Sequence, residues 1–292
     1  MSLVPFDDRD GEIWLNGELV PWRSAKTHTL SHGLHYASLV FEGERVYGGK
    51  IFKGKEHTKR LRISCNILDF DLPVMDEQLE LAKQKVLHAN KITDGYVRAF
   101  CWRGSEMMAV SAQKTSINLA IAAWEWPSYF DPVTKMAGIS LGIADWKRPS
   151  PESAPVHAKA AGLYMICTLS KHRAEQQGFQ DALMLDYRGY VAEATGANVF
   201  FVDKKGTLHT PTADCFLNGI TRQTVISLAK SMEIEVVERH IMPQELASMK
   251  ECFLTGTAAE VTPVSRIGDH EFVPSEICRQ MVEGYSSIVN PA

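Results

Sequence analysis

Residues 157–162 read His157-Ala158-Lys159-Ala160-Ala161-Gly162 and follow the proline-rich segment 149–155. Small neighbours let a bulky ligand approach the backbone around Lys159. The segment is predicted to open a helix, whose dipole would disfavour an ammonium and lower the pKa of Lys159. A neutral lysine amine can attack a carbonyl group, so Lys159 is a candidate nucleophile. A solvated surface lysine explains the same residue without any chemistry.

A second segment, residues 189–198, places Glu193 among small residues between two apolar runs. A buried carboxylate needs a cation or a hydrogen-bond donor, and a protonated pyridine nitrogen would serve. An exposed turn glutamate is the simpler interpretation of Glu193.

Two further segments are suited to an anion. Residues 219–222 begin a predicted helix, so free N–H groups and the Thr221 hydroxyl could hold a phosphate. Residues 255–259 are small and form a tight turn with exposed N–H groups. A threonine that only caps its helix and a plain β-turn explain the same patterns.

Composition excludes several classes of protein. The 292 residues carry 31 Lys and Arg against 35 Asp and Glu, which gives a net charge of −4. This balance argues against nucleic acid as a main partner, and the length predicts two domains. We find no secretory signal and no apolar run long enough for a membrane span. The six cysteines form no C-x-x-C pair, which predicts buried reduced thiols in a cytoplasmic protein and no metal.

The hydrophobic pattern predicts the main elements. Asn16-Gly17 is typical of a type I′ turn between strands at 12–15 and 18–22, with Pro21 at a sheet edge. Helices are predicted at 75–90, 160–177, 219–232 and 274–288, and strands at 96–102, 116–124, 181–185 and 198–202. Helices do not alternate regularly with strands, which favours an α+β fold with mixed or antiparallel sheets.

Residues 125–135 break the pattern with a run rich in proline and aromatic residues. We therefore expect a small N-terminal α+β domain over 1–124, a connector over 125–135 that faces a cleft, and a large domain over 136–292. The motifs G-x-G-x-x-G, H-E-x-x-H and G-x-S-x-G do not occur. NTPase, dinucleotide-binding, zinc-protease and hydrolase readings therefore lack their main evidence.

Taken in order, the motifs resemble the branched-chain amino acid aminotransferase family, fold-type IV enzymes that use pyridoxal 5'-phosphate (PLP). The resemblance is carried by residues 31–36, 40–45, 56–61, 96–98, 158–162, 193–198, 217–222 and 256–263. It implies a two-domain α+β fold similar to that of D-amino acid aminotransferase, with the cofactor at the domain interface.

The resemblance also implies roles for residues around the cofactor. Lys159 would bond to the PLP aldehyde and carry the proton between substrate and cofactor, and Glu193 would keep the pyridine nitrogen protonated. Tyr164 would hydrogen-bond the phenolic oxygen. The phosphate would be held by Arg60, Ile220, Thr221 and Thr257.

On the substrate side, the resemblance implies that Tyr96 and the N–H groups of Thr257 and Ala258 bind the α-carboxylate. Arg98 would receive the γ-carboxylate of glutamate. An apolar pocket for a branched side chain would be formed by Tyr36, Phe41, Trp126, Tyr129 and Tyr164, with Val110 on a loop that reaches the neighbouring subunit. The chain departs from the family at Ala99, where proline is usual, and in the polar loop 103–110.

These residues predict a ping-pong transaminase that moves the amino group of leucine, isoleucine or valine to 2-oxoglutarate. The alternatives of the same fold are a D-amino acid transaminase, an (R)-amine transaminase and aminodeoxychorismate lyase. A PLP-binding protein without turnover would need none of the substrate pocket. The expected partners are small amino acids and 2-oxo acids, and the family implies a homodimer or a higher homo-oligomer such as a hexamer.

Overall fold

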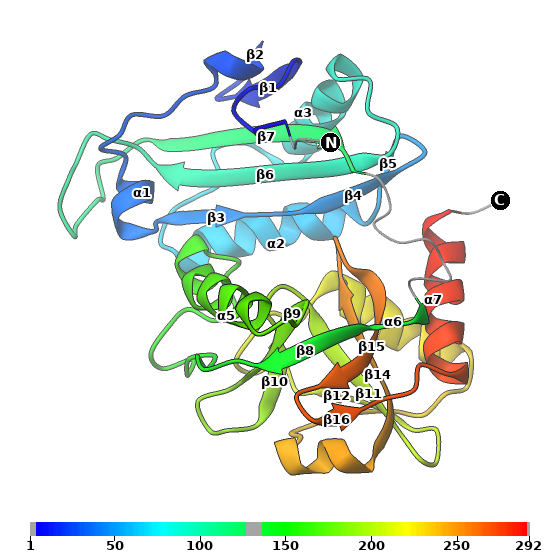
Figure 1. The fold of residues 1–292 in the computed structure, drawn as a ribbon. Coiled ribbons are helices and arrows are strands. Elements are labelled where there is room, and N and C mark those ends of the chain that lie inside the picture. The colour runs from blue at the N-terminus through cyan, green and yellow to red at the C-terminus, as the bar shows by residue number, and fades with distance from the viewer. Residues whose placement is uncertain (1–3, 127–135, 291–292) are drawn as a thin grey trace. The chain divides into compact units, whose positions relative to one another are not determined.

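The computed structural model describes residues 4–126 and 136–290, and the chain divides into two compact units. The first unit comprises Met1–Pro127 and Ala158–Gly162, and the second comprises Ser128–His157 and Leu163–Ala292 (Figure 1). The proposed division at 124 and 136 differs from these units chiefly in the short segment that carries Lys159.

Backbone bonds explain why this segment belongs to the first unit. The N–H of Phe41 donates to the carbonyl of Lys159 at 3.1 Å, and Ala160 forms an isolated β-bridge with Val40. The N–H of Lys159 donates to Ser64 Oγ at 3.0 Å. The segment therefore pairs with an edge of the first unit.

The first unit is built on a sheet whose described strands run in the order β2-β1-β7-β6-β4-β5, with β3 also paired to β6. Every pairing is antiparallel. Asn16 and Gly17 have φ of 49° and 118°, so the predicted hairpin is confirmed, and β2 lies at the sheet edge as Pro21 indicates. The strands are β1 (Glu12–Leu15), β2 (Glu18–Pro21), β3 (Leu39–Phe41), β4 (Glu44–Tyr47), β5 (Lys50–Ile51), β6 (Gly95–Arg103) and β7 (Ile117–Glu125).

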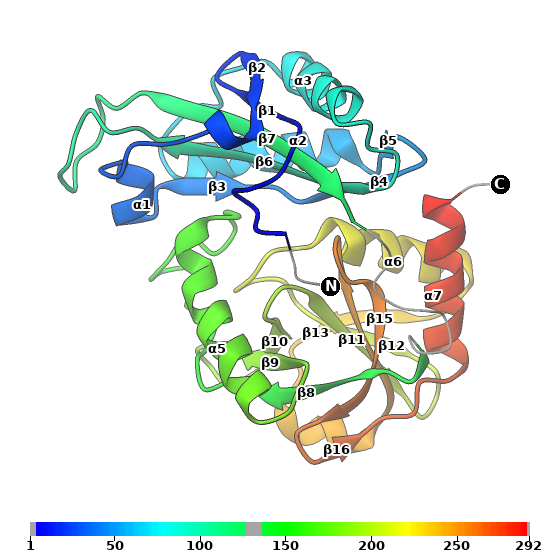
Figure 2. The same ribbon diagram turned by 45° about the horizontal axis from the view of Figure 1, so that its top comes forward.

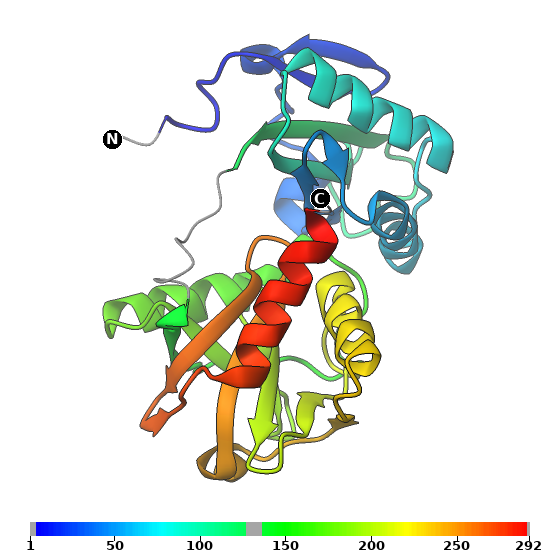
Figure 3. The ribbon, with the colours of Figure 1, turned by 90° about the vertical axis from the view of Figure 1, so that its right-hand side faces the viewer.

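Two long helices, α2 (Gly54–Ile67) and α3 (Asp76–Ala89), pack against each other and on one face of this sheet (Figure 3). The 75–90 prediction is confirmed by α3. Sequence reasoning missed α2, because half of the side chains that it buries are polar: His57, Thr58 and Ser64. The short elements are η1 (Trp22–Ser24) and α1 (His32–Tyr36).

The second unit contains a mixed sheet whose described strands run β10-β9-β8-β15-β14-β11-β12-β13, with β16 paired to β15. The β8–β9, β8–β15 and β12–β13 pairs are parallel and the others antiparallel. The strands are β8 (Ile139–Ile143), β9 (Asp181–Leu185), β10 (Val191–Ala194), β11 (Asn198–Asp203), β12 (Leu208–Pro211), β13 (Val236–Arg239), β14 (Met249–Gly256), β15 (Glu260–Ile267) and β16 (His270–Glu271).

Three helices cover this sheet: α5 (Met165–Gln176), α6 (Ile220–Ser231) and α7 (Glu276–Val289). Helix α5 packs on β8 and β9, whereas α6 and α7 pack against each other and on β14 (Figure 2). All three were predicted, although the first turn of the predicted 160–177 helix is the 3-10 helix η2 (Ala161–Tyr164). A second 3-10 helix is η3 (Pro243–Ser248).

The core of the second unit is formed by apolar side chains from the central strands. Phe200 and Phe253 are fully buried and stack with ring centroids 5.1 Å apart. Burying a phenylalanine contributes about 1.5–3 kcal/mol, so this pair helps to fix the register of β11 against β14. That register places Asn198 opposite Thr255.

Helices long and apolar enough to cross a membrane are absent from the described residues. The six cysteines are buried and free, as predicted.

Candidate active site

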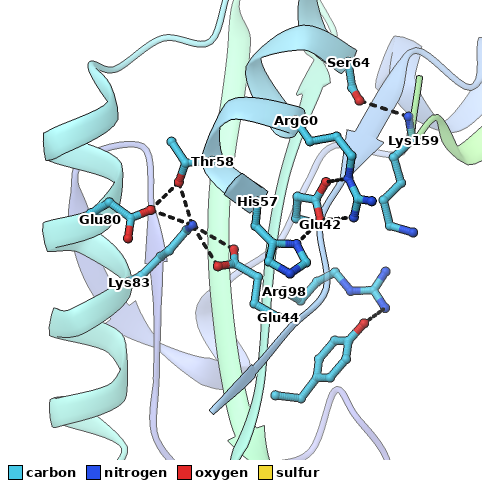
Figure 4. A network of polar contacts seen from close by, with 11 residues as sticks. Glu42, Glu44, His57, Thr58, Arg60, Ser64, Glu80, Lys83, Arg98 and Lys159 are labelled. Carbon is cyan, nitrogen blue, oxygen red and sulfur yellow. Dashed lines mark hydrogen bonds and ion pairs between the residues drawn. The ribbon is translucent and has the colours of Figure 1, made fainter. Parts of the chain in front are cut away.

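Lys159 lies in the first unit beside a group of side chains from β3, α2 and β6. Its Nζ is 4.8 Å from the centroid of the Phe41 ring, and its backbone is held by Phe41 and Ser64. Figure 4 shows the Lys159 side chain next to Arg60. The lysine is therefore anchored through its main chain, and its amine lies beside an aromatic face.

The pKa of Lys159 is lowered from 10.5 to about 8. Burial is the largest cause, and the charge of Arg60 lowers it further, whereas Glu42 acts in the opposite direction. The prediction that Lys159 opens a helix is wrong, because η2 begins at Ala161 and α5 at Met165. Desolvation and a neighbouring cation thus do what the sequence analysis assigned to a helix dipole.

Arg60 is held by a fully buried carboxylate. Its Nε and Nη2 donate to the two oxygens of Glu42 at 2.6 and 2.7 Å, and His57 Nδ1 lies 2.7 Å from Glu42 Oε2 (Figure 4). These cationic neighbours hold the pKa of Glu42 well below its usual range, against the effect of burial. A bidentate pair fixes the plane of the guanidinium, so Arg60 has a defined position beside Lys159.

A second buried ion pair stands beside the first. Lys83 Nζ contacts Glu44 Oε1 at 2.8 Å, Thr58 Oγ1 at 2.7 Å and Glu80 Oε1 at 2.9 Å. The side chains of Lys83 and Glu44 are fully buried, and burial raises the pKa of Glu44. Together the two networks explain why α2 buries polar residues: its inner face pairs with the alternating glutamates of residues 42–44.

Phe41, Tyr96 and Arg98 come together as the resemblance implies. The Arg98 guanidinium lies 4.6 Å from the Phe41 ring centroid, and its Nη2 is 3.5 Å from Tyr96 Oη. Tyr96 and Arg98 share one face of β6 because side chains alternate along a strand. A methyl group added at Gly43 would lie 1.7 Å from Tyr96 Oη, so the glycine makes room for this tyrosine.

The remaining pocket residues of the first unit are placed differently. Trp126 is half-buried and its ring centroid lies 5.2 Å from that of Tyr96. Tyr36 is exposed and stacks on His32, and Val110 is 86% exposed. Tyr129 lies outside the described residues. The substrate-binding roles of Tyr36, Val110 and Tyr129 therefore stay predictions.

In the second unit, Glu193 on β10 is held from two sides. Its Oε1 is 3.4 Å from Arg148 Nε, and its Oε2 accepts a hydrogen bond from Asn198 Nδ2 at 3.1 Å. Arg148 is itself 4% exposed and donates to the Leu163 carbonyl. Glu193 is therefore a largely buried carboxylate with a cation and an amide donor, not the exposed turn residue of the simpler interpretation.

Three loops of this unit meet near Glu193. A methyl group added at Gly256 would lie 3.3 Å from Ala197, so the β14–β15 turn adjoins the β10–β11 turn. The start of α6 joins them, because the Gly219 N–H donates to Asn198 Oδ1 at 3.2 Å. Thr257 and Ala258 lie in the β14–β15 turn, and Ile220 and Thr221 begin α6. The structure thus brings Glu193 and the predicted phosphate-binding residues of this unit to one place.

Tyr164 is the last residue of η2 and precedes α5. Next to it, Cys167 lies 3.5 Å from Arg148 Nη1, and burial raises the pKa of its thiol to about 11. This cysteine is therefore a packed thiol at neutral pH rather than a nucleophile.

The comparisons with known proteins agree with this geometry. The family model described as amino-transferase class IV matches residues 39–267. The chain belongs to this family. These bounds span both units and include Arg60, Lys159, Glu193 and Thr257.

Curated class IV relatives match over most of their length. A probable branched-chain-amino-acid aminotransferase of Rickettsia felis is 42% identical over 91% of this chain and 90% of its own. The branched-chain-amino-acid aminotransferase of Pseudomonas aeruginosa is 38% identical over 89% and 86%.

A solved branched-chain amino acid aminotransferase, from the source abbreviated T.th., superposes with a TM-score of 0.93 at 36% identity, covering 97% of this chain and 96% of its own. That structure contains pyridoxamine 5'-phosphate, and a second structure of it contains N-(5'-phosphopyridoxyl)-L-glutamate. The predicted α+β fold of fold-type IV aminotransferases is therefore confirmed.

The donor groups of this class IV chain fit PLP. Helix α6 has a glycine N-cap with no side-chain cap, so its first N–H groups suit a phosphate. The buried Thr255 hydroxyl, next to the β14–β15 turn, has no hydrogen-bond partner among the described residues. Glu193 suits a pyridinium nitrogen, and the amine of Lys159 suits an aldehyde.

Sequence reasoning gave no role to several residues that shape the site. Glu42 carried a usable signal, because a glutamate between Phe41 and Gly43 interrupts an apolar run and must find a cation when it is buried. Asn198 begins a strand directly after a turn, a place where an amide commonly bonds to backbone. Arg148 carried no local signal, since its partner Glu193 lies 45 positions away.

Proposed function

We propose that this class IV amino-transferase moves the amino group of leucine, isoleucine or valine to 2-oxoglutarate, with PLP as its cofactor. The observation that carries the proposal is Lys159, an amine whose pKa is lowered to about 8 beside Phe41 and Arg60. A lysine of this kind is neutral at a pH near 8 and can bond to an aldehyde.

PLP, when bound, would supply an electron sink for the bond that breaks at the substrate Cα. Glu193 would pair with its ring nitrogen, backed by Arg148 and Asn198. The N–H groups of Ile220, Thr221 and Thr257, with Arg60, would hold its phosphate, and Tyr164 its phenolic oxygen. Each unit of the chain supplies a share of these groups.

Lys159 would hold and move the proton at the substrate Cα, which requires an amine that is neutral at working pH. Its backbone anchors to Phe41 and Ser64 leave only the side chain to move. The lowered pKa and the fixed main chain thus serve the same step.

The substrate preference is proposed from the residues around Phe41. Phe41, Tyr96 and Trp126 offer apolar surface for a branched side chain, and Arg98 offers a guanidinium for the second carboxylate of glutamate or 2-oxoglutarate. The α-carboxylate would be bound by Tyr96 and the N–H groups of Thr257 and Ala258. The named relatives favour this substrate class over D-amino acids, amines and aminodeoxychorismate.

A half-reaction panel tests the proposal. The purified protein loaded with PLP is mixed with single L- or D-amino acids, and conversion of bound PLP to pyridoxamine phosphate is followed by absorbance. We expect conversion by L-leucine, L-isoleucine, L-valine and L-glutamate and none with Lys159→Ala. Conversion by D-amino acids alone would overturn the substrate assignment, and full conversion by Lys159→Ala would overturn the role of the lysine.

We further propose a cytoplasmic homo-oligomer, at least a dimer. Six free buried cysteines suit a reducing compartment. Exposed apolar side chains such as Leu30, Leu34 and Tyr36 suit a subunit contact. Light scattering of the purified protein tests the oligomer.

A further inference from the structure

Asn198, the first residue of β11, makes three hydrogen bonds with one side-chain amide. Its Nδ2 donates to Glu193 Oε2 at 3.1 Å and to the Leu217 carbonyl at 3.0 Å, and its Oδ1 accepts from the Gly219 N–H at 3.2 Å. The residue is 5% exposed. A single buried side chain thus joins a carboxylate on β10 to the residues that begin α6.

The chemistry of the partners fixes the orientation of this amide. A backbone N–H only donates, so the atom facing Gly219 must be the carbonyl oxygen. A backbone carbonyl and a carboxylate accept, so both hydrogens of Nδ2 are used. Asparagine is the side chain of this length that offers one acceptor and two donors, and aspartate would set a second carboxylate oxygen against Glu193.

Gly219 shows how closely the amide fits. Its φ is −60°, a conformation open to every residue, so the backbone does not require glycine. A methyl group added there would lie 2.2 Å from Asn198 Oδ1, whereas the next side chain, Arg222, is at 3.6 Å. The Asn198 amide therefore accounts for the glycine at the N-cap of α6.

We infer that Asn198 is a positioning residue that couples Glu193 to the first turn of α6. The inference rests on the proposed function, in which Glu193 meets the ring nitrogen of PLP and α6 meets its phosphate. One rigid amide would then set the spacing between the groups that hold the two ends of the cofactor. A displacement at either end is transmitted to the other through Oδ1 and Nδ2.

Cofactor affinity tests the coupling without turnover. Apoprotein is titrated with PLP and with pyridoxal, which lacks the phosphate and reports on the ring end. Asn198→Ala should weaken pyridoxal about tenfold, the effect of one hydrogen bond to a charged group, and should weaken PLP more. Asn198→Asp keeps the shape and the Gly219 contact, and should also weaken pyridoxal. Asn290→Ala, which removes an exposed amide of the same unit, should change neither affinity.

Gly219→Ala provides the decisive arm, because Gly219 does not contact Glu193 in any hydrogen bond of the described chain. By displacing the amide, it should weaken pyridoxal in the wild-type background and have little further effect in the Asn198→Ala background. If Gly219→Ala weakens PLP but leaves pyridoxal unchanged, or if the two substitutions multiply, the coupling is wrong. Thermal unfolding of each apoprotein identifies a variant that is merely unfolded, and Asn198→Asp then replaces Asn198→Ala.

The same titrations separate this inference from the proposed function. Wild-type protein that takes up no PLP, or that transfers no amino group, overturns the proposed function. Wild-type protein that does both, with unchanged pyridoxal affinity in Asn198→Ala and Asn198→Asp, overturns the inference alone.

Discussion

At the scale of single residues, the setting of Lys159 depends on the balance of charge around it. Arg60 and Arg98 lower its pKa, and Glu42 raises it. Since Glu42 is bonded to Arg60 through both oxygens, removing the arginine would take away a repulsive charge and leave an attractive one less compensated. Both changes act in the same direction on Lys159.

Arg60→Gln should therefore raise the pKa of Lys159 above its value of about 8. The measurement is the rate at which apoprotein reacts with pyridoxal as a function of pH, which follows the neutral amine. We expect a midpoint near 8 in the wild type and a higher midpoint in Arg60→Gln.

Arg62→Gln is the matched control, because Arg62 lies on the same helix but pairs with Asp76 and Val74. An equal shift in Arg62→Gln would show that loss of any cation on α2 suffices, and would contradict the specific effect of Arg60.

Arg98→Ala should discriminate between the two substrates. A buried carboxylate that loses its guanidinium partner costs about 2–4 kcal/mol, whereas leucine has no second carboxylate to lose. Steady-state kinetics should show a much larger loss of kcat/KM for 2-oxoglutarate than for leucine. Equal losses for both would remove Arg98 from recognition of the γ-carboxylate.

At the scale of elements, sequence patterns predicted those parts of the fold whose burial is apolar. Helix α3 buries Leu79, Ala82 and Val86 at helical spacing and was found, whereas α2 buries polar residues and was not. Ion pairing between segments far apart in the chain stabilises α2, and no local period reveals that. The same holds for Arg148 and Glu193, which only the folded sheet brings together.

Helix α7 provides an element-scale test of a different kind. Glu251 on β14 is 2% exposed and accepts hydrogen bonds from the N–H groups of Ser275 and Cys278 at 3.1 and 2.8 Å. It therefore caps the start of α7 from outside the helix. Glu251→Ala should lower the free energy of unfolding by about 1–3 kcal/mol, because buried donors lose their acceptor.

Urea unfolding of the apoprotein measures this change. Glu276→Ala removes an exposed carboxylate of the same first turn, which pairs with Arg279, and should change stability by less than about 0.5 kcal/mol. If the two variants lose the same stability, the buried cap contributes nothing beyond a surface charge.

At the scale of the whole molecule, the lowered pKa of Lys159 links folding to pH. The unfolded chain has a lysine pKa near 10.5 and the folded chain one of about 8, so between these values the unfolded state binds more protons. Lys159 therefore opposes folding below pH 8, and this penalty is relieved as the pH rises toward 10.5.

Apoprotein stability should thus rise with pH in this window relative to Lys159→Met, with a slope of at most about 1.4 kcal/mol per pH unit. Urea unfolding at several pH values, compared between the two proteins, isolates the lysine from other groups that titrate there. Parallel curves for wild type and Lys159→Met would contradict a lowered pKa in the folded chain.

The segment Ala158–Gly162 also constrains how such a gene can be divided or recombined. The chain passes from one unit to the other after residues 127, 157 and 162, so the first unit is discontinuous in sequence. A hybrid of two relatives joined only at residue 127 would pair one parent's Phe41 and Ser64 with the other parent's lysine strip. Chimeras that carry residues 158–162 along with 1–127 should inherit a matched lysine, which makes those five residues part of the heritable module.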